Sequence, residues 1–457
     1  MFHQTFIRTL FVAATLLPAV VAHANPYETT LANGMKVIVK EDRRAPSVVH
    51  MVWYRTGSMD EPEGVSGVAH VLEHMMFKGT RKVGPGEFNK RVAAVGGRDN
   101  AFTSKDYTAY FQQVPPTQLG PMMALEADRM QNLIITDAEF AREIEVVKEE
   151  RRLRTDDQPR ALVYEQLMAT AFQAHTYRRP VIGWMTDLDA MTAEDTREWY
   201  RRWYQPNNAY LVVVGDVDHQ AVFGMARQHY GKLKTANLPA RRISNEPEQR
   251  GPRKTAVRAP AELPYLAMAW QVPTLRDPTG DREAYALQVL AAILDGYDGA
   301  RLNRRLVRDS QIAVSAGAGY DGTGRGPSLF YLDGVPAAGQ TVESLEAALR
   351  SELQRIRDEG VSETELNRVK TQALASKVYK RDSLMGQAME IGYLEAAGLS
   401  WRDDERLLEG LRAVTADEVR AVAQRYFSDD TLTIARLDPQ PVGDKRARSP
   451  FAPAARH

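Results

Sequence analysis

The chain has 457 residues, with 59 basic and 59 acidic side chains, so its formal net charge is zero. That balance provides no electrostatic attraction to nucleic acid or to an anionic membrane. Cysteine is absent, which excludes disulfides, thiol catalysis, cysteine zinc sites and a lipid-modified amino-terminal cysteine. The length is ample for two or more domains, each with its own hydrophobic core.

Residues 1–24 have the pattern of a secretory signal peptide. Arg8 lies in a short polar start, an apolar run covers 10–21, and Ala-His-Ala at 22–24 forms an A-x-A cleavage site. We therefore expect the mature chain to begin near Asn25 and to reside in a bacterial periplasm. The apolar run is too short to span a membrane and no later segment approaches roughly 18 apolar residues, so no membrane span is expected.

Apolar or alternating runs predict β-strands over 36–40 and 48–54, and again over 107–114 and 211–214. Helices of ordinary length are expected between them. This mixture predicts an α+β protein.

The strongest functional pattern is His-Val-Leu-Glu-His at 70–74. On a helix, His70 and His74 face the same way and can bind one metal ion, while Glu73 can reach a water molecule held there. Ser66 is the expected N-cap. An apolar stripe at helical spacing predicts that the other side packs on a core: Val68, Val71, Leu72, Met75 and Met76. The alternative is an amphipathic helix whose two histidines merely face solvent.

A second helix is predicted over about 137–154, beginning with a T-x-x-E capping box at Thr136. Glu143 and Glu150 lie seven residues apart on one side of it, beside an apolar strip. Because a catalytic zinc takes three protein ligands, a carboxylate from this helix could complete the site. The alternative is a charged, solvated helix surface, which we expect for its remaining glutamates: Glu139, Glu145 and Glu149.

The second half of the chain repeats features of the first. A T-x-x-acid capping box at 192–195 begins a helix followed by a strand, and the same order recurs from 415–418, 223 residues later. The segment 286–296 is a fainter match to 69–79. In this match the positions of the first-half metal motif are apolar, namely Leu287, Leu290 and Ala291. The second half is therefore expected to contain a similar helix without a metal site.

These features predict two homologous domains, 25–236 with the metal site and 261–439 without one. The stretch 237–260 is rich in Pro, Arg, Asn and Glu, which suits an exposed linker. Residues 440–457 contain prolines and a basic run without hydrophobic periodicity, so we expect a disordered tail.

The chain resembles the pitrilysin/insulinase metallopeptidases, and it is most similar to the smaller bacterial members related to the mitochondrial processing peptidase beta subunit. Its motif H-x-x-E-H is the inverzincin signature. The resemblance covers most of the mature chain and is carried by these segments: Asn33–Met35, Gly67–Thr80, Asn100–Thr103, Val146–Glu150, Tyr177–Gly183 and Tyr204–Asn208. It implies two homologous halves, each a largely antiparallel sheet backed by helices, arranged as a clam shell around a substrate chamber.

The resemblance also implies roles for particular residues. One Zn²⁺ per chain would be held by His70, His74 and Glu150, and Glu143 would support the site. The zinc would lower the pKa of its bound water to about 7, and Glu73 would take the proton of that water and pass it to the leaving amine. The implied function is a zinc metalloendopeptidase that acts on peptides.

Residues 98–103 match the edge strand with which the family pairs its substrates. Three residues there are expected to lie nearest the peptide: Asn100, Ala101 and Phe102. An extended peptide can add to such an edge through main-chain hydrogen bonds. An ordinary turn and strand explains any single residue of this segment equally well.

The second half departs from the family pattern. Active members use an Arg and a Tyr, seven residues apart, to stabilise the developing oxyanion. The matching positions in this chain hold Val307 and Val314. If the alignment is shifted by one residue, Arg308 takes the place of the arginine, but Ser315 then stands in place of the tyrosine. The nearest tyrosine is Tyr320. We therefore expect a heterodimer in which a second family member, without the metal motif, supplies the Arg/Tyr pair. The competing arrangement is a monomer or homodimer in which Arg308 or Tyr320 substitutes.

A different class of function also has to be considered, a non-catalytic zinc-bearing subunit that binds peptides or serves a structural role. Non-catalytic family members are marked by a degraded metal motif, whereas the motif here is complete. A structural zinc would also require a fourth ligand, and no cysteine or suitably spaced histidine supplies one.

Overall fold

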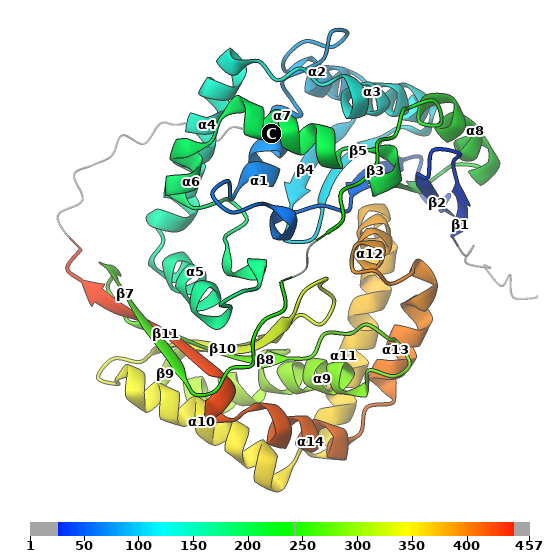
Figure 1. Ribbon diagram of the computed structural model, residues 1–457. Helices are drawn as coiled ribbons and strands as arrows, with labels where there is room; N and C mark the ends of the chain where they lie inside the picture. The colour runs from blue at the N-terminus through cyan, green and yellow to red at the C-terminus, as the bar shows by residue number, and fades with distance from the viewer. Residues whose placement is uncertain (1–25, 242–243, 443–457) are drawn as a thin grey trace, which may run out of the picture.

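The computed structural model describes residues 26–241 and 244–442. The signal peptide expected at 1–24 and nearly all of the tail expected at 440–457 lie outside these residues. The described chain forms two halves that face each other, each with a sheet and helices (Figure 1). The expected α+β class is confirmed. No helix in the described part is long and apolar enough to cross a membrane.

The first half is built on a sheet that contains, among the described residues, six strands in the order β1-β2-β6-β3-β5-β4. β2 and β6 run parallel, and all other neighbouring pairs are antiparallel. The strands are β1 (Tyr27–Thr30), β2 (Lys36–Glu41), β3 (Val48–Tyr54), β4 (Arg98–Thr103), β5 (Thr108–Val114) and β6 (Ala209–Gly215). The helices are α1 (Val68–Met75), α2 (Glu87–Ala94), α3 (Leu119–Asn132), α4 (Asp137–Arg151), α5 (Pro159–Ala171), α6 (Met185–Ala190), α7 (Ala193–Trp203) and α8 (His219–His229).

The second half has a sheet of five strands among the described residues, in the order β7-β11-β8-β10-β9, with β7 and β11 parallel. Without β1, the first sheet has the same order of strands, which supports the internal repeat. The strands are β7 (Arg253–Pro260), β8 (Tyr265–Val272), β9 (Ala313–Tyr320), β10 (Ser328–Pro336) and β11 (Leu432–Gln440). The helices are α9 (Arg282–Asp295), α10 (Val342–Glu359), α11 (Glu363–Asp382), α12 (Leu384–Ala396), α13 (Asp404–Arg412) and α14 (Ala416–Tyr426).

The repeated helix starts are present in both halves. Thr192 caps α7 and Thr415 caps α14, each with a reciprocal capping box, and the strands β6 and β11 follow. The segment Arg253–Pro260 was expected within the linker but forms β7 and pairs with β11. The side chains of β7 alternate between exposed and half-buried along most of its length. One face of this edge strand meets solvent, which is why its composition resembles that of a linker.

Each half contributes one helix to the sheet of the other half. α5 packs on the second sheet, where Val163 and Leu167 join a buried cluster with residues of β8 and β11. α12 packs on β3 and β6 of the first sheet, and its Ile391 joins the cluster around Trp53. Gly392 allows the close approach, because a Cβ there would lie 2.1 Å from the indole ring of Trp53. This exchange buries apolar surface of both halves together.

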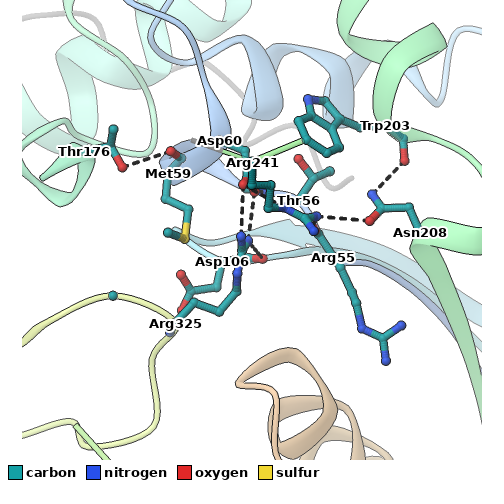
Figure 2. A network of polar contacts seen from close by, with 12 residues as sticks. Arg55, Thr56, Met59, Asp60, Asp106, Thr176, Trp203, Asn208, Arg241 and Arg325 are labelled. Carbon is teal, nitrogen blue, oxygen red and sulfur yellow. Dashed lines mark hydrogen bonds and ion pairs between the residues drawn. The ribbon is translucent and has the colours of Figure 1, made fainter. Parts of the chain in front are cut away.

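A polar network also joins the halves (Figure 2). Arg325, in the loop between β9 and β10, donates to the two carboxylate oxygens of Asp60 at 2.8 and 3.0 Å. Its backbone N–H donates to the carboxylate of Asp106 at 2.9 Å. Arg241 donates to the same Asp60 at 3.1 Å. Arg325 therefore connects the second half to two acidic residues of the first.

Candidate active site

The helix α1 has one buried side and one side that faces a cavity. The expected apolar stripe is fully buried. The N-cap of α1 is Gly67 rather than the expected Ser66. Glycine suits this position because its φ is 90° and a Cβ there would lie 2.9 Å from Cα of Gly183. Glu61 binds the free end of the helix, since its carboxylate accepts hydrogen bonds from the N–H groups of Gly67 and Ala69, both at 3.0 Å.

Three side chains converge between α1 and α4. Nε2 of His74 lies 3.3 Å from Oε2 of Glu150, and Nε2 of His70 lies 3.9 Å from the same oxygen. One donor atom from each residue lies within 4.8 Å of the other two. The donor atoms of a tetrahedral zinc site are about 3.3–3.6 Å apart, given metal–ligand distances of about 2.0–2.2 Å. The donor set and its spacing therefore fit a zinc ion with three protein ligands.

Their surroundings set the protonation states of these three groups. Burial, and then the neighbouring His74, lower the pKa of His70 to about 3. Burial favours a higher pKa for Glu150, but the hydrogen bond from His74 and the nearby His70 lower it to about 2. Burial opposes charge on His74, yet Glu143 and Glu150 raise its pKa to about 9. Neutral His70 and ionised Glu150 can bind a metal directly, whereas His74 must first release a proton.

Glu143 and Lys78 hold the imidazole of His74. Oε1 of Glu143 lies 2.9 Å from Nδ1 of His74, and Oε2 accepts a hydrogen bond from Nζ of Lys78 at 2.5 Å. Because Nδ1 is bound to a carboxylate, Nε2 is the nitrogen that faces Glu150. Burial favours a higher pKa for Glu143, but His74 and Lys78 outweigh it and lower the pKa. Glu143 is therefore placed to orient a ligand.

Glu73 lies beside the two histidines and is tied to the first sheet. The hydroxyl of Thr103, at the end of β4, donates to Oε2 of Glu73 at 2.5 Å. Burial raises the pKa of Glu73, although the bond from Thr103 acts in the opposite direction. A carboxyl group whose pKa is raised towards neutrality is suited to exchanging protons.

A cavity of about 980 Å³ lies in front of these groups, between α1, β4 and α4. Its lining includes His70, Glu73, His74, Glu150, Asn100, Ala101 and Phe102. β4 is an edge strand, paired with β5 alone among the described residues. Its other edge can therefore pair with an added strand. Glu145 and Glu149 are exposed, as expected, and they line the rim of the same cavity.

The second half has no counterpart to this site among the described residues. Leu287, Leu290 and Ala291 are buried in the second core. The hydroxyl of Tyr320 donates to the carbonyl of Pro273 at 2.6 Å. The residues that line the cavity include neither Arg308 nor Tyr320. Val314 is exposed and Val307 is packed against the core, and the described residues that line the cavity all belong to the first half.

The described residues contain one more group with metal-ligand atoms, Glu41, Asp218 and His219. There the carboxylate of Glu41 accepts from the backbone N–H of His219 at 2.9 Å and lies 2.7 Å from its Nδ1. Asp218 caps α8. Hydrogen bonding and helix capping therefore explain why these three side chains lie close together, and no metal ion is needed to explain it.

Four residues that contact the site residues or the start of α1 were not identified from the sequence: Glu61, Lys78, Thr103 and Arg154. Nη1 of Arg154 lies 2.5 Å from Oε1 of Glu150. Lys78 and Arg154 each follow a ligand by four residues, so helical spacing alone could have identified them as neighbours of the ligands. Thr103 lies 30 residues after Glu73, and only the packing of α1 on β4 brings the two together.

Comparisons of the sequence identify relatives along most of its length. Residues 36–184 match the family model described as insulinase (peptidase family M16), and residues 190–373 match the model described as peptidase M16 inactive domain. Zinc protease PqqE of Helicobacter pylori is 31% identical over 455 residues, which cover 96% of this chain and 100% of that protein. A probable mitochondrial-processing peptidase subunit beta of Arabidopsis thaliana is 26% identical over 90% of this chain and 78% of that protein.

Solved structures have the same architecture. A protease from Helicobacter pylori aligns with a TM-score of 0.86 at 29% identity, covering 91% of this chain and 100% of that chain. The periplasmic protease PqqL from Escherichia coli aligns with a TM-score of 0.78 at 21% identity, over 93% of this chain and 49% of that chain, a similarity of fold. With two halves of matching topology, two matching family models and a relative that covers 96% of the chain, this protein belongs to the pitrilysin/insulinase family, peptidase family M16.

Proposed function

We propose that the chain is a zinc-dependent endopeptidase that hydrolyses peptides or unfolded segments. The observation that carries this proposal is the convergence of His70, His74 and Glu150 next to Glu73, in a cavity bordered by a free sheet edge. Zn²⁺ held by these three ligands would supply Lewis-acid chemistry, lowering the pKa of a water molecule to about 7 and polarising the scissile carbonyl.

Three side chains of the protein have separate roles in the reaction. Glu73 accepts the proton of the attacking water and returns it to the leaving amine. Thr103 holds one oxygen of Glu73 and so limits rotation of its carboxyl group. Glu143 keeps the imidazole of His74 directed at the metal position.

The substrate binds as an added strand along β4, with Asn100, Ala101 and Phe102 nearest to it. Main-chain hydrogen bonds to a sheet edge hold a peptide extended with little dependence on its sequence. Large apolar side chains that are exposed in the cavity wall, Val146 and Leu153, offer contacts to an unfolded chain. We expect the protein to act in a periplasm, after removal of residues 1–24.

The active species is a heterodimer. The positions matched to the Arg/Tyr pair hold Val307 and Val314, and the hydroxyl of Tyr320 is bound to a backbone carbonyl. A second family member that lacks the metal motif supplies the pair and stabilises the oxyanion. Without these donors the chain alone should be slower by about 10²–10³-fold. The absence of the pair equally suits the alternative, a non-catalytic zinc-bearing subunit that binds peptides.

The test combines metal analysis with a fluorogenic-peptide assay, on the chain alone and on the chain with a partner that carries the Arg/Tyr pair. Wild type, Glu73→Gln and Glu149→Gln should all bind one zinc. With the partner, Glu73→Gln should be slower than wild type by about 10²–10⁴-fold, because an amide cannot accept the proton. Glu149→Gln, the matched control on the exposed side of α4, should stay close to wild type.

Two results would contradict these assignments. Normal turnover by Glu73→Gln would remove its role as general base. Full activity of the single chain, unchanged by a partner and abolished by Arg308→Ala, would replace the heterodimer with a self-sufficient enzyme. If zinc is bound but no combination cleaves any peptide, the non-catalytic alternative holds.

A further inference from the structure

A second cavity, of about 380 Å³, adjoins the metal site. It shares His70, Thr103, Glu150 and Arg154 with the first cavity and extends past Lys105 to Tyr164 and Tyr177. Thr103 is the last residue of β4. A peptide paired along β4 would therefore pass the metal ligands and leave the strand edge at the mouth of this second cavity, which we call the Lys105 pocket.

The ammonium group of Lys105 has no charged partner in this pocket. It lies 4.8 Å from the centre of the Tyr177 ring and makes no hydrogen bond or ion pair with any described residue. Burial lowers the pKa of Lys105 to about 8. A half-buried, partly desolvated cation without an anionic partner in ion-pair distance is unfavourable unless something else compensates it. The contact with the aromatic ring supplies part of that compensation.

The nearest acids are bound elsewhere. Asp106 accepts from the hydroxyl of Tyr177 at 2.5 Å and from the backbone of Arg325 at 2.9 Å. Asp321 accepts from the backbone and hydroxyl of Thr323. Neither carboxylate comes within ion-pair distance of Lys105, so the ammonium group remains available to a ligand.

The other charges around the Lys105 pocket are already paired. Arg154 binds Glu150, Arg178 binds Glu63, Arg179 donates to the carbonyls of Glu61 and Pro62, and Glu165 binds Arg151. Lys105 is therefore the cation in this lining that has no anionic or carbonyl partner among the described residues. The aromatic rings of Tyr164 and Tyr177 can cover the methylene groups of a bound side chain.

We propose that the Lys105 pocket is a substrate subsite for a carboxylate, carried by an Asp or Glu side chain or by the C-terminus of the peptide. The proposal rests on the proposed function, because it requires a peptide bound along β4 beside the metal ligands. It adds a preference of the enzyme for peptides with an acidic group at one fixed distance from the scissile bond.

The test is a binding measurement on the full mature chain, loaded with Zn²⁺ and carrying Glu73→Gln to prevent hydrolysis. Fluorescence anisotropy is recorded with a peptide blocked at both ends, in which one Glu or one Gln is moved through successive positions. A second pair of peptides ends in a free carboxylate or an amide, which separates the two sources of the carboxylate. At one or two adjacent positions Glu should bind about tenfold more tightly than Gln, as for one charge-assisted hydrogen bond.

Variants identify the side chain responsible. Lys105→Met should remove the preference for Glu at those positions and leave the affinity for the Gln peptides unchanged, whereas Lys105→Arg should keep the preference. Lys90→Met, on the exposed surface of α2, is the matched control and should behave as the parent chain.

The outcomes separate this inference from the proposed function. Peptide binding without preference for a carboxylate at any position overturns the subsite alone, and so does a preference that persists in Lys105→Met. The comparison of Glu with Gln peptides on the parent chain decides the question even where Lys105→Met does not fold. Failure of every peptide to bind would overturn both the subsite and the proposed peptide-binding function.

Discussion

At the scale of single residues, three glutamates near the metal position differ in their partners and therefore in what they can do. Glu150 points at both histidines, Glu73 is held by a hydroxyl group, and Glu143 contacts Nδ1 of His74 and the ammonium of Lys78. The chemistry of a carboxylate is the same in each case. Its contacts decide whether it can bind a metal, move a proton or orient another side chain.

The role of Glu143 predicts a change in metal affinity. Glu143→Gln should weaken zinc binding by about 10–100-fold, because the imidazole of His74 loses its charged partner. Competition with a chromophoric chelator measures this affinity. Glu139→Gln, a change at a half-buried residue of the same helix that does not contact the metal ligands, should leave the affinity unaltered. Equal affinities for both variants would show that Glu143 does not orient the ligand.

At the scale of elements, capping groups and ion pairs connect helices that are distant in sequence. Glu365 belongs to the capping box of α11, and both of its oxygens accept hydrogen bonds from the guanidinium of Arg301 at 2.8 Å. Arg301 lies just beyond the end of α9. One carboxylate therefore stabilises the start of α11 and fixes it against the neighbouring segment.

This arrangement predicts how stability depends on pH. The hydrogen bond from Arg301, opposed by burial, lowers the pKa of Glu365 from 4.5 to about 2. Because the folded pKa is the lower one, the stabilisation is present above about pH 4.5 and is lost as pH falls towards 2. Glu365→Gln should therefore lower the melting temperature at pH 7, and its difference from wild type should shrink on acidification.

Calorimetry at pH 7, 5 and 3.5 measures this difference. The exposed neighbour Glu363, which lies in the same turn, provides the control variant Glu363→Gln, for which we expect little change. A deficit of Glu365→Gln that stays constant over this range would show that ionisation of Glu365 does not contribute.

At the scale of the whole molecule, two halves of equal topology are held together by exchanged helices and by the network around Asp60. α5 and α12 bury apolar surface across the boundary, and Arg325 adds an ion pair with Asp60 there (Figure 2). Apolar burial is not directional, whereas the bidentate contact of Arg325 requires one orientation of the halves. The network is thus suited to fixing the angle between them.

Removing Arg325 tests this contribution. Arg325→Ala should increase amide hydrogen exchange in residues 321–328 and around 58–60, since both segments lose the ion pair between Arg325 and Asp60. Breaking a buried ion pair typically lowers the free energy of unfolding by about 3–5 kcal/mol. The loss here should be smaller, because Arg241 remains bound to Asp60. Arg258→Ala, at an exposed pair on β7, serves as control. Unchanged exchange in both segments would show that the network does not hold the halves together.

Much of the fold and of the candidate metal site could be predicted from the sequence because the patterns that indicate them are local. The spacing of His70 and His74 places both on one face of a helix, and the capping boxes at Thr192 and Thr415 mark equivalent helix starts. The departure at Val307 and Val314 is likewise a property of the sequence. These features depend on residues within a few positions of one another, for which helix geometry is sufficient.

Tertiary structure alone decided the rest. It brought Thr103 to Glu73, included β7 in the second sheet, and exchanged α5 and α12 between the halves. It also left Lys105 without an anionic partner among the described residues. Each of these contacts depends on which segments, distant in sequence, pack together. The apolar surface buried over the whole molecule determines that packing, and no local sequence pattern does.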